Sequence, residues 1–294
     1  MLLLAGCGDS TSTSAQRANM TVMLVPADGG TSDGTIADFK PLFDAVSRQV
    51  NIDFKISVGT SYVSVVEAMA ADKIDIAFFG PVSFLLARER GAAELLAVGV
   101  QNGKSEYFSV LVTSSQSDIA NIADLAGRSV ALGDVNSTSS FTVPIKMLLD
   151  ADLDPVRDVG GIYLLGNHAS AIQAVAAARV DAAFTSADSY ERFINNTASN
   201  ASDFHIVSRS NAIPYPPLAV RPNVDAAIKI KLKTAIHSLR SEGNNQLRGY
   251  AGKPVDSFNA FFDEEEYVLA LQRVVDVDTA LKNAIIAKAM SKAS

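Results

Sequence analysis

The sequence predicts an α/β protein built from two related lobes. From residue 20 onward, short apolar runs rich in β-branched residues alternate with helical patterns, which is typical of sheets with many parallel strands. Residues 66–78 match residues 172–184 at six of thirteen positions without a gap, which indicates an internal repeat. The length of 294 residues is sufficient for two lobes with a sizeable core.

The predicted strands are short runs of Val, Ile, Leu and Phe bounded by turn residues. They cover residues 21–25, 52–58, 74–78, 95–100, 129–132, 161–164, 182–184 and 204–207. The predicted helices lie between the strands, where apolar residues recur at helical spacing. They cover residues 36–50, 63–71, 141–151 and 170–178.

Each copy of the repeat predicts an Ala-rich helix, a basic residue and then a strand that starts near Asp75 or Asp181. The offset of 106 residues also relates Tyr62 to His168, each of which directly precedes its helix. Ligands of open α/β sheets bind beyond the carboxyl ends of the strands. Two facing lobes would therefore place Tyr62 and His168 on opposite walls of one cleft. A chance likeness of Ala-rich segments is the alternative.

Composition excludes several classes of function. There are 25 Lys and Arg against 32 Asp and Glu, whereas a general nucleic-acid binder needs a basic surface. No run of about 18 apolar residues predicts a membrane span. A single cysteine excludes an internal disulfide and a Cys-rich metal site. Since Gly-x-Ser-x-Gly, Walker and His-Glu-x-x-His motifs are also missing, we expect no enzyme activity, no cofactor and no metal.

The single cysteine, Cys7, follows a short apolar run that ends in Ala5 and Gly6. This arrangement resembles the end of a bacterial lipoprotein signal, in which the cysteine is acylated. The run is shorter than the roughly 7–15 residues of a usual hydrophobic region, and no basic residue precedes it. We therefore interpret residues 1–19 as a truncated signal and a polar tether, with Cys7 as the lipidation site. A chance cysteine is the alternative.

The stretch 130–141 is the most informative for function. An apolar strand ends in the turn Gly133-Asp134, and four hydroxyl residues, 137–140, then precede a helical pattern. Such residues favour the first turn of a helix, where backbone N–H groups lack intrahelical acceptors and the dipole is positive. This turn can bind a tetrahedral oxyanion without Lys or Arg. Pro144 is expected at about the fourth helical position.

With these motifs the chain resembles the phosphate/phosphite/phosphonate-binding proteins of ABC importers, which are type II periplasmic binding proteins. The motifs that carry the resemblance lie between about residues 21 and 221. They are Ser61-Tyr62, Phe79-Gly80-Pro81 with Ser83, residues 106–111 and 124–128, Gly133-Asp134 with 137–139, Gly166-Asn167-His168, Ile213-Pro214 and residues 218–221.

The resemblance implies a two-lobed fold with a mixed, mainly parallel sheet in each lobe and a hinge of two crossings. We expect residues 20–110 and 218–294 in lobe 1 and residues 111–217 in lobe 2. The crossings are expected around 108–112 and 217–220.

The resemblance also implies the ligand contacts. Ser137, Thr138, Ser139 and His168 would bind the oxyanion from one lobe, and Tyr62 and Tyr107 from the other. Members that bind aminoalkyl phosphonates hold the ligand ammonium with two carboxylates.

Asp188 falls at the first of these carboxylate positions, whereas residues 213–217, which hold the second, contain no acid. An amine in such a half-made site would lose water without full pairing. Two further departures from the family pattern are Ser140, where a glycine is usual, and Ala169, where an Asp is frequent.

We therefore expect an extracytoplasmic, lipid-anchored, monomeric solute-binding protein of an ABC importer. It would capture phosphite or methylphosphonate, with phosphate as a further candidate, and deliver it to a permease, without contacting nucleic acid. Three alternatives stay open: an aminoalkylphosphonate-binding transport component, a phosphorus-ester hydrolase and a ligand sensor. A hydrolase would need a general base for Ser137, for which the sequence offers no evident partner.

Overall fold

The computed structural model describes residues 17–27, 32–197, 199–242 and 246–293. Cys7 and most of the expected signal and tether lie outside these residues. Ala18 and Asn19, expected at the end of the tether, are instead the first residues of strand β1 (Ala18–Leu24). They pair in parallel with Ile52 and Asp53 of β2 (Ile52–Val58), which holds this end of the segment in the sheet.

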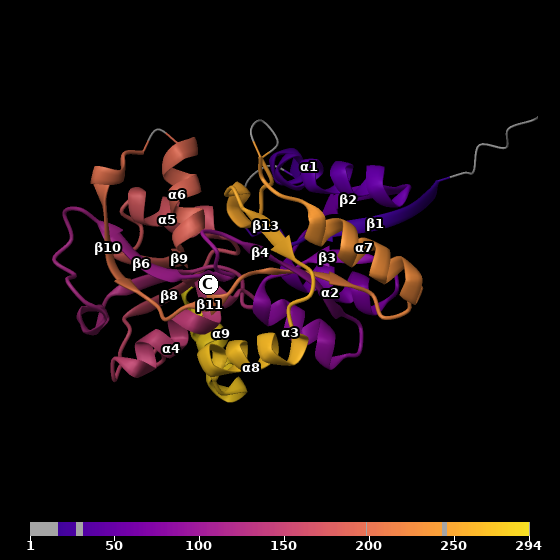
Figure 1. Ribbon diagram of the computed structural model, residues 1–294. Coiled ribbons are helices and arrows are strands. Elements are labelled where there is room, and N and C mark those ends of the chain that lie inside the picture. Colours follow the sequence, from indigo (N-terminus) through magenta and orange to yellow (C-terminus); the bar gives the residue numbers. More distant parts are fainter. Residues whose placement is uncertain (1–16, 28–31, 198, 243–245, 294) are drawn as a thin grey trace, which may run out of the picture.

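The first lobe is built on a sheet with the strand order β13-β4-β12-β3-β1-β2. The other strands of this sheet are β3 (Ile76–Phe78), β4 (Glu94–Val100), β12 (Pro217–Val220) and β13 (Ser257–Asn259). Helices α1 (Ser32–Val50) and α7 (Ala226–Ser238) cover one face. Helices α2 (Tyr62–Ala70) and α3 (Pro81–Glu89) lie on the other face, below the sheet in Figure 1.

The second lobe is built on a sheet with the order β10-β6-β9-β7-β8. Its strands are β6 (Ser109–Ser114), β7 (Ser129–Leu132), β8 (Gly161–Leu164), β9 (Ala182–Ser186) and β10 (Phe204–Arg209). Helices α5 (His168–Ala176) and α6 (Ala187–Asn196) cover one face, and α4 (Val143–Asp150) lies on the opposite side (Figure 1). All predicted strands and helices are present, with ends that differ by a few residues.

The internal repeat is visible in the two lobes. Helices α2 and α5 begin and end 106 residues apart, and their N-caps, Ser61 and Asn167, are also 106 residues apart. After each helix the backbone takes a left-handed conformation, with φ of 56° at Asp72 and 52° at Ala178.

The two aspartates of the repeat play the same structural role. The Asp75 carboxylate accepts hydrogen bonds from the backbone N–H and hydroxyl of Thr21 at 2.8 and 2.9 Å. The Asp181 carboxylate accepts the equivalent pair from Ser129 at 2.7 and 2.5 Å. Each aspartate thus ties the first residues of the repeat strand to the neighbouring parallel strand.

Both sheets are mixed, but they are not mainly parallel as predicted. Among the described strands of the first sheet, β1 pairs in parallel with β2 and β3, whereas the β12–β3, β12–β4 and β13–β4 pairs are antiparallel. In the second sheet, β7 pairs in parallel with β8 and β9, whereas β6 pairs antiparallel with β9 and β10. Most of the antiparallel pairs arise because the chain re-enters the first lobe through β12 and enters the second through β6, and each of these strands runs against both of its neighbours in the sheet.

The hinge differs slightly from the expected positions. Strand β5 (Glu106–Tyr107) pairs antiparallel with β11 (Ile213–Pro214), which forms a two-stranded ribbon between the lobes. The second crossing therefore lies before residues 217–220, which already form β12 inside the first sheet. Tyr107 belongs to this ribbon.

The C-terminal segment corrects the expectation that residues 218–294 all belong to the first lobe. Helix α8 (Glu264–Val275) contacts α3 and α4, and α9 (Thr279–Ala293) lies against β8 of the second sheet. Ile285 and Ala289 of α9 are buried. The Lys288 ammonium donates to the carbonyl oxygens of Pro155 and Val156, at 3.3 and 2.7 Å, and of Val159. The apolar side of α9 and these Lys288 hydrogen bonds hold the helix on the second lobe.

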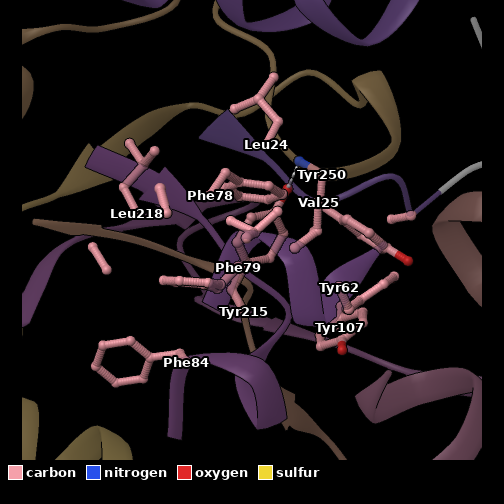
Figure 2. Close-up of a cluster of buried hydrophobic side chains, with 14 of the residues drawn as sticks. Leu24, Val25, Tyr62, Phe78, Phe79, Phe84, Tyr107, Tyr215, Leu218 and Tyr250 are labelled. Atoms are coloured by element: carbon pink, nitrogen blue, oxygen red, sulfur yellow. Dashed lines mark hydrogen bonds between the residues drawn. The ribbon is translucent and has the colours of Figure 1, made fainter. Parts of the chain in front are cut away.

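The largest buried apolar cluster extends from the first sheet through the hinge into the second lobe. Its aromatic side chains include Phe78, Phe79, Tyr107, Tyr215 and Tyr250, with Tyr62, Tyr107 and Tyr250 gathered on one side of the group (Figure 2). In the described part of the chain, no helix is both long enough and apolar enough to cross a membrane.

Candidate functional site

The hydroxyl-rich segment forms a π-helical turn, η2 (Thr138–Thr142), that leads into α4. The N–H groups of Thr142 and Val143 donate to the carbonyls of Ser137 and Thr138, five residues back. Pro144, expected at about the fourth helical position, is instead the second residue of α4. It has no N–H to donate to Ser140, whose carbonyl accepts from the Gly133 N–H at 3.0 Å. The proline therefore explains the wider turn.

The predicted hydroxyls meet one predicted tyrosine in this turn. Ser137 is the N-cap, and its Oγ accepts from the Ser140 N–H at 3.3 Å. The Tyr107 hydroxyl is hydrogen-bonded to the side chains of Thr138 and Ser139. Burial, with a smaller contribution from the Asp188 carboxylate, raises the pKa of Tyr107 well above its usual value, so the phenol stays protonated. Its O–H is therefore available as a donor at neutral pH.

Several hydrogen bonds bring the lobes into direct contact at this turn. The Val82 N–H, in the first turn of α3, donates to Thr138 Oγ1 at 2.8 Å. The backbone N–H of Tyr62, the first residue of α2, donates to the Asp134 carboxylate. The first residue of α5 completes the contact, since the His168 N–H donates to the carbonyl of Ala27 at 3.1 Å. Tyr62, Thr138 and His168 are each at most 2% exposed, so the structure is closed.

His168 is held as a neutral ring. Its Nδ1 accepts from the Ser186 N–H at 3.1 Å and lies 2.8 Å from Thr185 Oγ1. The proton must then be on Nε2, which lies 2.9 Å from the Tyr250 hydroxyl. Burial lowers the pKa of His168 from 6.5 to about 3, which excludes an imidazolium at neutral pH. His168 therefore has one neutral N–H donor, which in this structure is given to the Tyr250 hydroxyl and would have to leave it to reach an oxyanion.

This protonation state predicts how stability depends on pH. The unfolded chain binds a proton at His168 below its ordinary pKa of 6.5, whereas the folded protein does so only near 3. Stability contributed by the neutral ring is thus present above 6.5 and is lost as the pH falls below that value. We expect a loss of about 2 kcal/mol between pH 7 and pH 5 from this residue.

Urea unfolding of the wild type and His168→Gln at both pH values measures this effect. The variant should lose about 2 kcal/mol less than the wild type on acidification. Asp134, whose pKa burial raises, titrates in both proteins and cancels in the comparison. Equal losses in the two proteins would show that His168 is not the group responsible.

Asp188 lies close to these residues, but in the structure it faces a cation. It is the second residue of α6 and its side chain is 11% exposed. The Lys253 ammonium lies 3.6 Å from its Oδ1 and also contacts the Glu191 carboxylate. Asp188 is thus near enough to raise the pKa of Tyr107, but its charge is already compensated.

Sequence reasoning missed Tyr250, the central residue of the interlobe contact. Its hydroxyl bonds His168 Nε2 and lies 3.1 Å from Ser189 Oγ, and its N–H donates to the Tyr215 hydroxyl at 2.8 Å. Its ring lies edge-on to those of Tyr107 and His168, with centroids 5.4 and 6.2 Å away. Tyr250 lies beyond the motifs that carry the family resemblance, which end near residue 221. A tyrosine between Gly249 and Gly252 was the only available signal.

The arrangement supports anion binding and offers no evident metal centre. Within the described ranges, no three His, Cys, Asp or Glu side chains come together as a metal site would require. The polar groups that do converge are hydroxyls, a neutral imidazole and the start of a helix. These are the donors that bind a tetrahedral oxyanion without a cationic side chain.

Comparisons with known proteins agree with this chemistry. A family model described as the periplasmic substrate-binding protein of the phosphonate ABC transporter matches residues 29–265. The phosphonates-binding periplasmic protein of Escherichia coli (strain K12) is 25% identical over 197 residues, 65% of this chain and 58% of that protein. The phosphate-import protein PhnD of Mycolicibacterium smegmatis is 26% identical over 253 residues, 79% and 77% of the two chains.

A solved structure supports the fold. PhnD1 of Prochlorococcus marinus, in complex with methylphosphonate, superposes with a TM-score of 0.74 at 18% identity, over 87% of this chain and 97% of that one. The likeness extends over both lobes and matches the predicted two-lobed fold. Because the family model covers more than half of the sequence, this chain belongs to the periplasmic substrate-binding proteins of phosphonate ABC transporters.

Proposed function

We propose that this protein captures a small phosphorus oxyanion without an amine between its lobes and delivers it to an ABC permease. Phosphite and methylphosphonate are the first candidates, and phosphate is a further one. The observation that carries the proposal is the convergence of the Tyr107, Thr138 and Ser139 hydroxyls at the start of a buried helical turn. Ser137, Tyr62 and His168 complete the proposed contact set.

The donors suit an oxyanion in a protein whose net charge is −7. Backbone N–H groups at a helix start carry a partial positive charge, and hydroxyls add neutral donors. The His168 Nε2–H would add one more on exchanging the Tyr250 hydroxyl for the ligand. In a site from which water is excluded, each such contact is stronger than it would be in solution. Lobe closure, which buries these groups, therefore contributes directly to affinity.

The absence of an amine from the ligand follows from the second carboxylate position. Where aminoalkyl-phosphonate binders would carry an acid, this chain has the segment around Tyr215, whose ring is fully buried. Asp188 alone would leave a ligand ammonium half paired.

The contacts do not favour a hydrolase. Ser137 Oγ accepts from the Ser140 N–H, while His168 is bonded to Ser186, Thr185 and Tyr250. These bonds do not pair the serine with a general base. We further propose that Cys7 is acylated and that the protein is a monomer, held by this lipid anchor on the outer side of the cytoplasmic membrane.

Titration calorimetry of the purified protein with phosphite, methylphosphonate, phosphate and 2-aminoethylphosphonate tests the ligand. We expect binding of at least one of the first three and weak or no binding of the aminated compound. Failure of all four to bind would contradict the oxyanion proposal, and preference for the amine would identify the aminoalkylphosphonate alternative. Hydrolysis of a phosphonate ester during the titration would instead indicate an enzyme.

A further inference from the structure

The turn at residues 249–253 closes over the site from the first lobe. It contains the short helix η4 (Tyr250–Gly252), in which Ala251 and Gly252 have φ of 55° and 66°. The Gly249 N–H donates to the Lys253 carbonyl at 2.9 Å, and the Arg248 guanidinium donates to the Gly252 carbonyl at 2.8 Å. A left-handed backbone at a non-glycine residue such as Ala251 is costly and persists only where its surroundings hold it.

The surroundings of the turn come from both lobes. A Cβ on Gly252 would lie 2.4 Å from the Arg192 guanidinium and 2.8 Å from the Asp38 carboxylate. Arg192 of α6 and Asp38 of α1 themselves form an ion pair at 2.5 Å. The turn is therefore seated against an interlobe ion pair, and only a glycine allows this approach.

The turn places two side chains at two different parts of the proposed site. Tyr250 reaches His168, which is proposed to contact the oxyanion. Lys253 reaches from the first lobe to Asp188 and Glu191 of α6 in the second lobe. Beside this pair is a cavity of about 320 Å³, lined by Asp38, Asp188, Glu191, Arg192, Arg248 and Lys253 among others. This polar cavity is connected to the proposed site through Asp188, which lines it and also contributes to the raised pKa of Tyr107.

We propose that Lys253 is a specificity-determining residue. Its own ammonium group occupies the place beside Asp188 that the ammonium of an aminated ligand would need. The inference rests on the proposed oxyanion function and attributes the selectivity against aminated ligands to the Lys253 side chain. An ammonium that is part of the protein is already paired with Asp188 and Glu191. An aminated ligand must displace it, whereas phosphite or methylphosphonate leaves it in place.

The physical basis is charge pairing in a partly buried site. The Lys253 side chain is 29% exposed and that of Asp188 is 11% exposed, so their interaction is screened less than a surface pair. The Lys253 ammonium and a ligand ammonium beside the same Asp188 carboxylate repel each other. Without the Lys253 ammonium, the largely buried Asp188 carboxylate keeps a charge that the ligand ammonium can neutralise. Specificity here comes from a repulsive group as well as from attractive ones.

The test compares affinities for methylphosphonate and 2-aminoethylphosphonate in the full-length wild type, Lys253→Met and Lys253→Met/Asp188→Asn. Methionine keeps most of the side-chain length but removes the charge. We expect Lys253→Met to shift the ratio of the two dissociation constants at least tenfold toward the aminated ligand. The double variant should lose this shift, because the carboxylate that would bind the amine is gone.

Lys146→Met is the matched control. Lys146 is 33% exposed and pairs with Asp150 at 2.7 Å on α4, outside the proposed site. The Lys146→Met variant should leave the ratio of the two dissociation constants within twofold of the wild-type ratio. Circular dichroism and thermal unfolding establish that each variant is folded, and Lys253→Arg, which keeps the charge, should retain the wild-type preference.

The outcomes separate the inference from the function on which it rests. If the wild type binds an oxyanion but Lys253→Met leaves the ratio of the two dissociation constants unchanged, the role of Lys253 is overturned and the proposed function stands. The role of Lys253 is also overturned if the wild type already prefers the aminated ligand. A wild type that binds no oxyanion overturns the proposed function and this inference with it.

Discussion

Thr138→Val should lower the affinity for the bound oxyanion by about 10- to 150-fold. Thr138 Oγ1 accepts the interlobe hydrogen bond from the Val82 N–H at 2.8 Å and is bonded to the Tyr107 hydroxyl. Valine has the same shape but no hydroxyl, so the ligand loses a donor and the Val82 N–H loses its acceptor. A hydrogen bond to a charged group contributes about 1.5–3 kcal/mol, which corresponds to this range of affinity.

Thr142→Val is the matched control for this experiment. Thr142 lies four residues further along the same turn, is fully buried, and its Oγ1 has no hydrogen-bond partner among the described residues. The same substitution there removes no contact and should leave the affinity within about twofold. Calorimetry with the best ligand of the panel measures both. If the two variants weaken binding equally, the effect comes from general disturbance of the turn rather than from the Thr138 hydroxyl.

Gly133→Ala should destabilise the protein by about 1–3 kcal/mol, as expected for overpacking. The added Cβ would lie 2.2 Å from Ser140 Oγ and 2.9 Å from Ser140 Cβ, within the turn that holds the proposed anion site. The family resemblance described above implies a glycine where this chain has Ser140. Restoring that glycine removes both atoms of the clash, so Gly133→Ala/Ser140→Gly should cost little more than Ser140→Gly alone.

A double-mutant cycle measured by urea unfolding tests this coupling. Ser140→Gly alone should cost about 1 kcal/mol, the usual penalty for a helical glycine, and the coupling energy should be about 1–3 kcal/mol in favour of the double variant, close to the cost of Gly133→Ala alone. Gly133→Ala/Ser140→Ala is the control, since alanine removes Oγ but keeps Cβ, and it should recover only part of the loss. Strict additivity of the two single changes would contradict the predicted clash.

Much of the fold could be predicted because its signals are local. Strands β1, β2, β7 and β8 and helices α2 and α5 follow from runs of apolar residues at the spacing of each element. The repeat is also local, since each copy contains its own helix, left-handed turn and strand, and so its 106-residue offset appears in the structure. The direction of strand pairing was less accessible, because β6 and β12 take theirs from the hinge rather than from their own residues.

The sequence by itself determined the two related α/β lobes, the hydroxyl-rich helical turn and the residues that carry the family resemblance. The tertiary structure alone decided that Tyr250 reaches His168 across 82 residues of chain, that Lys253 faces Asp188 and that α9 lies on the second lobe. It also decided the protonation of His168, which depends on the Ser186 N–H and on burial. The physical reason is that residue spacing reports on contacts within an element, whereas these contacts join elements that lie far apart in the chain.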